Sequence, residues 1–498
     1  MITINTKRNI DRGSALYRKL ADASSRLEKK DSTLWGKAAE AEASIRLNWV
    51  DLPRASLALL PTLEEIKKKF GVRKKVILCG MGGSSLGPEV IAATFKRDLF
   101  ILDSTDPDYL AHALTGDFSE SLIIVGSKSG STLETSSQKL FFEKFLTDKG
   151  LDPKEHILIV TDSGSPFDIS SRETGYSVIN ADPHVGGRFS VLSAFGLTPS
   201  ALIGVDCAAL LVDAQEVFNE LDKAIDVAYL LATEVSQYCG FTDAGSGLPG
   251  LSDWIEQLIA ESTGKDGVGR LPVVTEDVEG ARSTGFGITF SSGGDLDVIA
   301  PLGAHFIFWE WVTALLGVAL EIDPFNQPNV TEAKEQSSAL LLEWGGKVPL
   351  LTPTSSNGAI EVFGISLKEL IAKIPHGGYL AIMAYLDRKD ESELTALRSI
   401  LAKKLDIPVT FGWGPRFLHS TGQFHKAGQP NGAFLQISGE CVHDYQVPGK
   451  NYTFLTLINA QCQGDGKALA ARKYPTTRLH LRDRKAGLSQ LLADARAL

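Results

Sequence analysis

Short apolar runs alternate with longer segments of helical periodicity along much of the chain. The apolar runs, several of them rich in β-branched residues, stand at 75–79, 99–102, 122–125, 156–161, 378–385 and 408–411. Such runs are typical of strands buried in a parallel sheet. A segment between them repeats apolar residues at helical spacing, as at Leu133, Leu140 and Phe145. The alternation predicts an α/β fold with doubly wound parallel sheets.

The first part of the chain lacks such runs and is predicted to be helical. Residues 11–30 and 33–46 have the periodicity of amphipathic helices, so we expect residues 1–70 to form a helical extension that covers the first domain. Residues 205–238 are a further long helical segment, expected to lead into a second domain. Residues 301–320 are nearly all apolar and long enough to span a bilayer. They include charged or titratable side chains and lack a basic flank, which favours a buried core helix.

Composition and charge narrow the classes of function. The net charge of −10 argues against nucleic-acid binding, which needs a basic face. The 5 cysteines are scattered without a Cys-x-x-Cys pair, and the N-terminus has no apolar signal core. We therefore expect a cytoplasmic protein that binds neither nucleic acid nor membrane.

The turn after residues 122–125 has the pattern of an anion site. Residues 126–131 are glycines, serines and Lys128, and a helix is predicted from Thr132 onward. Free backbone N–H groups at a helix start, together with the helix dipole, favour a ligand such as a phosphate monoester. An ordinary helix N-cap with surplus serines explains the same pattern, so this segment alone leaves both interpretations open.

A second glycine-rich turn follows residues 75–79. It reads Gly-Met-Gly-Gly-Ser-Ser-Leu-Gly over residues 80–87, a spacing that does not match the dinucleotide fingerprint. Clustered glycines after a strand let a ligand approach the backbone closely. In doubly wound sheets ligands bind at the carboxyl ends of the strands, where both Ser84 and Ser127 are predicted to lie. The two turns could therefore converge on one small anionic ligand.

Several other residues are ambiguous when taken singly. Arg188 follows two glycines. Its guanidinium could present a forked set of hydrogen-bond donors to a ligand, or the residue could be an exposed loop arginine. Glu261 lies in the last turn of a predicted helix, where the dipole disfavours a structural carboxylate and a base is better suited; a solvated glutamate is the alternative. Lys334 alone would be a surface lysine. His419 and His425 lie in a turn of small polar residues, where a histidine can shuttle a proton or serve structurally.

Taken together and in order, these motifs resemble those of the glucose-6-phosphate isomerase (phosphoglucose isomerase) family. Residues 80–87 match Gly-Ile-Gly-Gly-Ser-x-Leu-Gly with Met81 in place of Ile, and residues 127–135 match Ser-Lys-Thr/Ser-x-Thr-Thr-x-Glu-Thr with Ser131 in place of Thr. The further matches are Gly-Gly-Arg-Phe/Tyr-Ser at 186–190, Glu-Ser-x-Gly-Lys at 261–265 and Phe-Asp-Gln-Pro-Gly-Val-Glu-x-x-Lys at 325–334.

The sequence also departs from the family pattern. Asn326, Asn329 and Thr331 replace the family's Asp, Gly and Glu. The matching histidine motif, at 418–423, follows Lys334, whereas in the family it usually precedes the lysine motif. That order resembles the isomerase half of fused transaldolase–isomerase chains.

The resemblance implies a fold and an activity. The fold would be two sugar-isomerase-type (SIS-type) α/β domains, at residues 71–240 and 241–498, after the helical extension at 1–70. The activity would be the interconversion of glucose 6-phosphate and fructose 6-phosphate through a cis-enediol, with no metal or other cofactor. Members of the family are usually dimers, so a homodimer is expected.

The resemblance also implies a role for each matched residue. Glu261 would be the proton-shuttling base, and Arg188 would stabilise the enediolate. His419 would assist ring opening, with Lys334 near the ring oxygen or O1. The residues expected to hold the phosphate are Ser84, Ser127, Lys128, Ser129 and Thr132, and those expected to contact the rest of the substrate are Gly83 and Gln327.

Alternatives remain open at this stage. The enzyme could also accept mannose 6-phosphate, which shares the same base. A non-catalytic sugar-phosphate sensor would keep the serine turns and could discard Glu261 and Lys334, so their presence favours an enzyme. The choice between His419 and His425 for ring opening also stays open.

Overall fold

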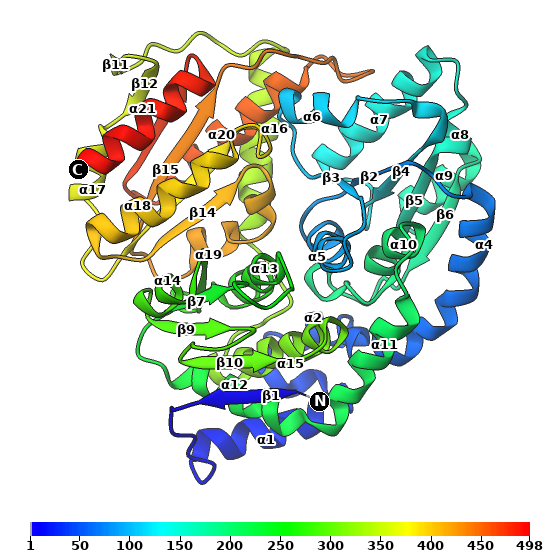
Figure 1. Cartoon of the computed structure of the whole chain (residues 1–498), viewed down its shortest axis with the longest axis vertical. Coiled ribbons are helices and arrows are strands. Elements are labelled where there is room, and N and C mark those ends of the chain that lie inside the picture. The colour runs from blue at the N-terminus through cyan, green and yellow to red at the C-terminus, as the bar shows by residue number, and fades with distance from the viewer. Residues whose placement is uncertain (1) are drawn as a thin grey trace.

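The computed structural model describes residues 2–498, except for the side chains of residues 330, 331 and 333. Thr331, one of the departures from the family pattern, is therefore outside the described side chains. Within the described residues the chain forms three sheets. In Figure 1 the first lies at the upper right, the third at the upper left and the second below them.

The first sheet is wholly parallel and has the order β3-β2-β4-β5-β6. Its strands are β2 (Lys75–Cys79), β3 (Phe100–Leu102), β4 (Ser121–Gly126), β5 (Ile157–Asp162) and β6 (Ser177–Ala181). The helices of this part are α4 (Leu60–Phe70), α5 (Leu86–Thr94), α6 (Pro107–Ala113), α7 (Leu133–Asp148), α8 (Pro153–His156), α9 (Pro166–Thr174) and α10 (Ala194–Leu202). Strands β4 and β5 are buried along their whole length, as their continuous apolar character predicts.

The second sheet has the order β1-β10-β9-β7-β8, and only β1 runs antiparallel to its neighbour. Its strands are β1 (Thr3–Thr6), β7 (Tyr238–Thr242), β8 (Leu271–Val274), β9 (Phe286–Thr289) and β10 (Leu296–Ile299). The helices of this part are α1 (Ala15–Leu27), α2 (Glu40–Ser44), α3 (Leu52–Ala55), α11 (Cys207–Glu216), α12 (Leu221–Thr233), α13 (Leu251–Thr263), α14 (Val278–Ser283) and α15 (Leu302–Leu320).

The third sheet has the order β11-β12-β16-β15-β13-β14. Its strands are β11 (Ser355–Asn357), β12 (Ile360–Gly364), β13 (Tyr379–Tyr385), β14 (Val409–Trp413), β15 (Gly432–Gly439) and β16 (Thr476–Leu481). The strands β16, β15, β13 and β14 are mutually parallel, whereas β11 and β12 pair antiparallel. The helices of this part are α16 (Val330–Trp344), α17 (Leu367–Ala372), α18 (Ala396–Leu405), α19 (Gly422–Ala427), α20 (Phe454–Ala471) and α21 (Arg484–Ala497).

The predicted α/β class with mainly parallel sheets is confirmed, whereas the predicted number of sheets is wrong. Residues 241–498 hold strands of two sheets, not of one, and the boundary placed near residue 240 falls within β7. Residues 1–70 are not wholly helical either, because β1 joins the second sheet. The division into domains itself stays a prediction.

Two predicted helices are shorter or broken. The helix expected over 33–46 is interrupted because Gly36 adopts φ 85°, and only a 3₁₀ turn at Ser32–Trp35 and the short α2 form. The segment 205–238 divides into α11 and α12 before β7 begins. The prediction of a core helix at 301–320 is confirmed: α15 is long and apolar enough to cross a membrane, but 94% of that window is buried inside the protein.

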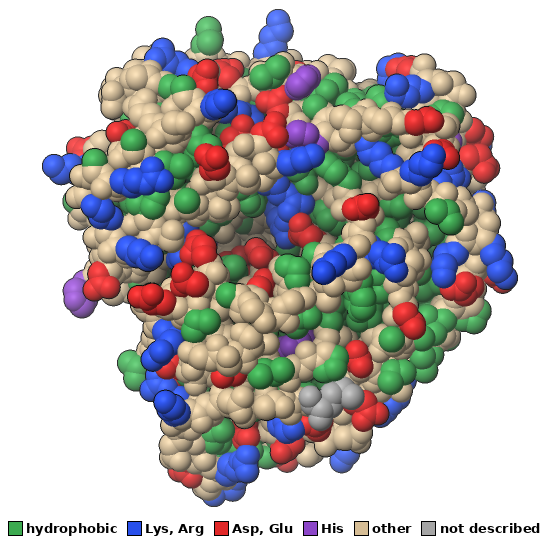
Figure 2. Space-filling view, in the orientation of Figure 1, with side chains coloured by type: hydrophobic (Ala, Val, Ile, Leu, Met, Phe, Trp, Pro, Cys, Tyr) green, Lys and Arg blue, Asp and Glu red, His purple; other side chains and the backbone are tan. Residues whose placement is uncertain are grey.

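The elements of the three sheets meet around a hollow. The face drawn in Figure 2 is visibly hollowed near its centre, between α5, α13 and β14 as placed in Figure 1. None of the predicted site residues lines this hollow, but the loops and helix ends that carry them also meet, so the fold brings parts of the sequence that are far apart to one region.

Candidate active site

The two glycine- and serine-rich turns lie side by side. Strands β2 and β4 are parallel neighbours, so the turns that follow them emerge at the same sheet edge. The Ser84 hydroxyl donates to the carbonyl of Gly126 at 3.2 Å, which joins one turn to the other. The two turns thus lie at one sheet edge, as predicted; that they share one anionic ligand stays a prediction.

The turn after β4 is organised by its own serines. The hydroxyl oxygen of Ser127 accepts a hydrogen bond from the backbone N–H of Gly130 at 3.1 Å. The hydroxyls of Ser129 and Ser131 are 2.6 Å apart. Thr132 is the N-cap residue of α7, but its side chain makes no capping hydrogen bond. The hydroxyl of Thr132 is therefore not engaged in capping, and the N-terminus of a 16-residue helix faces this turn.

Lys128 is directed to a protein carboxylate. Its ammonium lies 2.7 Å from Asp162 and donates to the carbonyl of Val185 at 2.8 Å. Burial lowers the pKa of Lys128, and the charge of Asp162 opposes that shift. This pairing links the turn after β4 to the end of β5 and to the segment that leads to Arg188.

The glycine turn after β2 touches the arginine loop directly. A Cβ atom at Gly83 would lie 2.0 Å from the carbonyl oxygen of Gly187, so only glycine fits at position 83 in this arrangement. At Gly82, which has φ 56°, a Cβ atom would lie 3.1 Å from the Cβ of His419. Gly82 and Gly83 thus lie against the loops that carry Arg188 and His419.

Arg188 is buried and its guanidinium donates to several acceptors. Only 4% of the residue is exposed. It donates to the hydroxyl of Ser262 at 2.7 Å, to Oε1 of Gln327 at 2.9 Å and to the carbonyl of Pro324 at 2.6 Å. Burial lowers the pKa of Arg188, and the Glu261 carboxylate opposes that shift.

Glu261 lies at the centre of this arrangement, in the last turn of α13. Its Oε1 is 3.4 Å from Nη1 of Arg188, and its Oε2 accepts a hydrogen bond from Gln257 at 3.2 Å. Gln257 also donates to the backbone carbonyl of His419 at 2.7 Å. One amide side chain therefore connects the predicted base to the segment that holds the predicted ring-opening histidine.

His419 is paired with a buried carboxylate. Its Nε2 lies 3.1 Å from Oε1 of Glu134, which also accepts a hydrogen bond from Gln461 at 2.8 Å. Burial opposes ionisation of Glu134, yet the charge and hydrogen bond of His419 hold the pKa of Glu134 below its ordinary value. His419, Glu134 and Lys334 line one cavity of about 100 Å³, and the Lys334 residue is exposed.

His425 occupies a different environment. It is buried, stacks on Tyr379 and has its Nδ1 2.9 Å from the Tyr379 hydroxyl. Burial lowers the pKa of His425 to about 3. Such a ring stays neutral at ordinary pH, and the geometry favours His419 over His425 as the functional histidine.

The structure brings most of the predicted site residues into one region. Arg188, Glu261 and Gln327 are in direct or shared contact, Gly83 abuts the arginine loop, and His419 is joined to Glu261 through Gln257. Lys334 lines the cavity next to His419. Ser84 and Ser127 lie on the adjoining turns, whereas the charge of Lys128 is held by Asp162.

Sequence reasoning did not assign roles to Gln257 and Glu134. Gln257 precedes Glu261 by four residues, a spacing that places both on one helix face, so the signal was available. Glu134 lies inside the matched serine motif, but it reads as an ordinary acidic residue in the first turn of a helix. Its partner His419 is 285 residues away, and no local pattern links the two.

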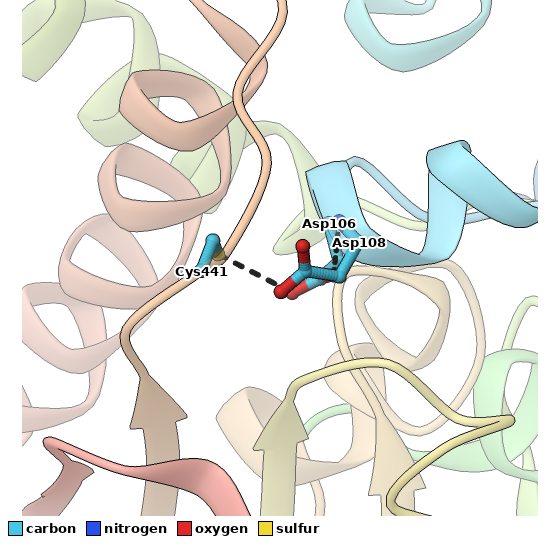
Figure 3. Close-up of side chains that lie close together, drawn as sticks. All are labelled: Asp106, Asp108 and Cys441. Atoms are coloured by element: carbon cyan, nitrogen blue, oxygen red, sulfur yellow. Dashed lines mark hydrogen bonds between the residues drawn. The ribbon is translucent and has the colours of Figure 1, made fainter.

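A cluster with possible metal ligands lies elsewhere and does not behave as a metal centre. Figure 3 shows Asp106, the N-cap residue of α6, and Asp108 of α6 facing Cys441, which follows β15. Arg484 donates to Oδ2 of Asp106 at 2.6 Å and to the Cys441 sulfur at 2.8 Å. The guanidinium already supplies the positive charge that this cluster needs, so the cluster is a polar contact between α6 and the third sheet.

Comparison with known proteins supports the resemblance for part of the chain. The family model described as phosphoglucose isomerase matches residues 66–237. This segment resembles the phosphoglucose isomerase family. It includes the first sheet, both serine-rich turns and Arg188, whereas Glu261, Lys334 and His419 lie beyond it.

Curated relatives carry the same name. The chain is 31% identical over 236 residues to a "Probable glucose-6-phosphate isomerase" of Haloarcula marismortui, covering 44% of this chain and 54% of that protein. It is 33% identical over 227 residues to a "Glucose-6-phosphate isomerase" of Campylobacter jejuni, covering 42% and 55%. The matched segments thus span about half the length of these relatives.

A solved structure shares the fold. The crystal structure of a glucose-6-phosphate isomerase from Chlamydia trachomatis matches with a TM-score of 0.55 and 20% sequence identity, over 69% of this chain and 88% of that one. At this identity the match shows the fold alone. It agrees with the α/β architecture described above.

Proposed function

We propose that the protein is an aldose–ketose isomerase that interconverts glucose 6-phosphate and fructose 6-phosphate. The observation that carries the proposal is the buried pair of Glu261 and Arg188, located next to the serine-rich turns of the first sheet. A carboxylate and a fixed cation beside a helix N-terminus suit a ligand that has a carbonyl carbon at one end and a phosphate at the other. The match of residues 66–237 to the phosphoglucose isomerase model supports the same substrate class.

In the proposed mechanism Glu261 moves a proton between C2 and C1 through a cis-enediol. One carboxylate suffices, because the group that removes the proton on one face can return it on the same face. Gln257 donates to Oε2 of Glu261, which leaves Oε1 directed towards Arg188 and the developing charge. General base catalysis of this kind contributes about 10²–10⁴-fold to the rate.

Arg188 would stabilise the enediolate oxygen. Its guanidinium is fixed by Ser262, Gln327 and the Pro324 carbonyl, so little reorganisation is needed when negative charge develops on the substrate. A preorganised donor in a buried site is worth about 10²–10³-fold in rate.

The phosphate would lie at the two turns of the first sheet. The N-terminus of α7 supplies backbone N–H groups, and the residues predicted to add side-chain donors are Ser84, Ser127, Ser129, Thr132 and Lys128. Because Asp162 holds the ammonium of Lys128, we expect hydroxyls and backbone N–H groups to contribute more than this lysine.

Ring opening would be assisted by His419. Its pairing with Glu134 fixes the ring orientation, and Lys334 lines the same cavity. A histidine whose ring is oriented by a carboxylate can transfer a proton to or from the ring oxygen.

The decisive experiment is Glu261→Gln, assayed for isomerisation and for fructose 6-phosphate binding. We expect turnover to fall by about 10²–10⁴-fold while binding persists, because the amide keeps the shape and loses the base. Glu173→Gln, an exposed position on α9, is the matched control and should behave as the native protein. Near-normal turnover of Glu261→Gln would refute the assignment.

The same assays separate the alternatives. Native protein that binds fructose 6-phosphate but converts neither sugar phosphate would be a sensor. Conversion of mannose 6-phosphate at a rate comparable to that of glucose 6-phosphate would indicate the broader isomerase. The proposed homodimer is tested by light scattering after size-exclusion chromatography.

A further inference from the structure

A second cavity, separate from the candidate active site, opens on the face drawn in Figure 2. Its volume is about 470 Å³, in the range of small-molecule sites. Its walls come from α5, the first half of α13, the end of β14 and the loops after β8 and β13. Figure 2 shows acidic side chains gathered around the hollow, with a basic side chain on its wall.

The arginines that line this cavity are already paired. Arg388 contacts Glu89 at 2.6 Å, and Arg416 contacts the other oxygen of Glu89 at 2.5 Å. Arg398 pairs with Glu276. Arg388 and Arg416 each lie within 3.4 Å of the buried Asp103 as well. These positive charges are neutralised within the protein, so the wall does not offer a free cationic group to an anion.

Two carboxylates on α13 are left without such partners. Glu256 lines the cavity with only 7% of its surface exposed, and it has no hydrogen bond or ion pair to any of the described residues 2–498. Asp253 lies one turn earlier on the same helix and also lines the cavity, but its side chain is exposed. Burial, together with the charge of Asp253, raises the pKa of Glu256 well above its ordinary value.

An unpaired buried carboxylate is costly unless something compensates it. A cation placed beside Glu256 and Asp253 would supply the missing partner. Burial disfavours the charged form of Glu256 as long as no cation is beside it, so the arrangement is better suited to holding a ligand than to stabilising the fold.

Aromatic side chains also line the cavity. Phe411, Trp413 and Phe417 line the cavity, and the rings of Phe411 and Trp413 meet edge to face at 4.9 Å. Phe411 and Trp413 are only partly buried, so ring surface is open to a ligand. Aromatic faces attract organic cations as well as hydrocarbon groups.

We propose that this cavity binds a small organic amine, with its ammonium group held by Glu256 and Asp253 and its hydrocarbon part against Phe411 and Trp413. A divalent metal ion fits less well, because such ions take six or more oxygen ligands and the cavity offers two unpaired carboxylates. An inorganic anion is disfavoured because the arginines on the wall are already paired with carboxylates. The site is distinct from the one around Glu261, since Glu256 and Glu261 are turned roughly 140° apart around α13.

Benzylamine is a suitable probe, because it combines an ammonium with an aromatic ring. Isothermal titration calorimetry on the full chain would compare it with benzyl alcohol, which keeps the ring and lacks the charge. We expect benzylamine to bind at least tenfold more tightly than benzyl alcohol. Glu256→Gln should weaken benzylamine binding at least tenfold, and Glu256→Gln with Asp253→Asn should abolish it.

Glu279→Gln, an exposed position on α14, is the control and should leave benzylamine binding unchanged. Circular dichroism would establish that the variants fold. Equal affinity for benzylamine and benzyl alcohol would overturn the proposal, as would unchanged benzylamine binding in folded Glu256→Gln. Binding of Mg²⁺ alone, or of inorganic phosphate in place of the amine, would also overturn it. Fructose 6-phosphate isomerisation is not part of this test, so the proposal stands or falls independently of the proposed function.

Discussion

Nη1 of Arg188 lies 3.4 Å from Oε1 of Glu261, and both side chains are buried. Arg188 follows the first sheet, whereas Glu261 lies in the last turn of α13, a helix that packs beside the second sheet. The pair therefore holds two parts of the fold together at the place where the proposed chemistry occurs. Its geometry depends on Ser262, Gln327 and the backbone carbonyls of Pro324 and Asn326, which accept hydrogen bonds from the guanidinium.

Replacement of Arg188 tests whether the planar guanidinium, as well as the positive charge, is needed for the rate of isomerisation. Arg188→Lys keeps a positive charge but cannot donate to the acceptors in that planar arrangement. We expect the rate of isomerisation to fall by about 10²–10³-fold, with a smaller change in KM. Arg172→Lys, at an exposed arginine that pairs with Asp168, is the control. A loss confined to KM would place Arg188 in substrate binding only.

A methyl group at position 83 should separate two loops. The Cβ of Gly83→Ala would lie 2.0 Å from the carbonyl oxygen of Gly187, so the backbone has to shift. Overpacking of this kind costs about 1–3 kcal/mol of the free energy of unfolding. Gly187→Ala is the matched control, because no atom lies within 4 Å of its added Cβ. Urea denaturation of both variants measures the difference, and equal stabilities would contradict the close contact.

The strands that could be predicted from the sequence are those marked by a local pattern of apolar residues. The strands β2, β4 and β13 were predictable because continuous apolar runs bounded by turns indicate buried strands. The second and third sheets were not separated, because β9 and β10 are only four residues long and β11 is polar and exposed. Pairing between strands that are hundreds of residues apart, such as β1 and β10, leaves no local signal in the sequence.

The same distinction between local patterns and tertiary contacts applies to the candidate active site. Glu261 and Arg188 were candidates from motif spacing, and Gln257 could have been found from its position one turn before Glu261. Only the structure shows that His419 pairs with Glu134 and that Lys128 forms an ion pair with Asp162. Both depend on tertiary contacts between segments that no periodicity connects.

The two histidines of the 418–426 segment should differ in their effects. His419→Ala should slow conversion of cyclic glucose 6-phosphate by about 10²–10⁴-fold and affect open-chain substrate much less, because ring opening precedes proton transfer. His425→Ala should mainly lower thermal stability, since it removes a buried ring packed on Tyr379. Kinetics on cyclic and open-chain substrates, with melting curves, distinguish them. The reverse pattern would exchange the two roles.

A pH dependence of stability is expected from α15. His305 is fully buried, and neither ring nitrogen has a hydrogen-bond partner among the described residues. Burial lowers the pKa of His305 to about 3. The unfolded chain takes up a proton below about pH 6.5 while the folded chain does not, so stability falls as the pH falls through that value.

His305→Leu should remove this contribution. Between pH 7 and pH 5 the native protein should lose about 2 kcal/mol more of its free energy of unfolding than the variant. Urea denaturation at the two pH values measures this, with His184→Leu at an exposed position as the control. Parallel pH profiles for native protein and His305→Leu would show that His305 does not titrate on unfolding.

The backbone contact between Gly83 and Gly187 also bears on how a substrate could be enclosed. Because there is no room for even a methyl group between them, the turn after β2 and the loop that carries Arg188 should move together as one unit. Under the proposed function, a closing motion over the sugar phosphate would have to move both loops together or come from another segment.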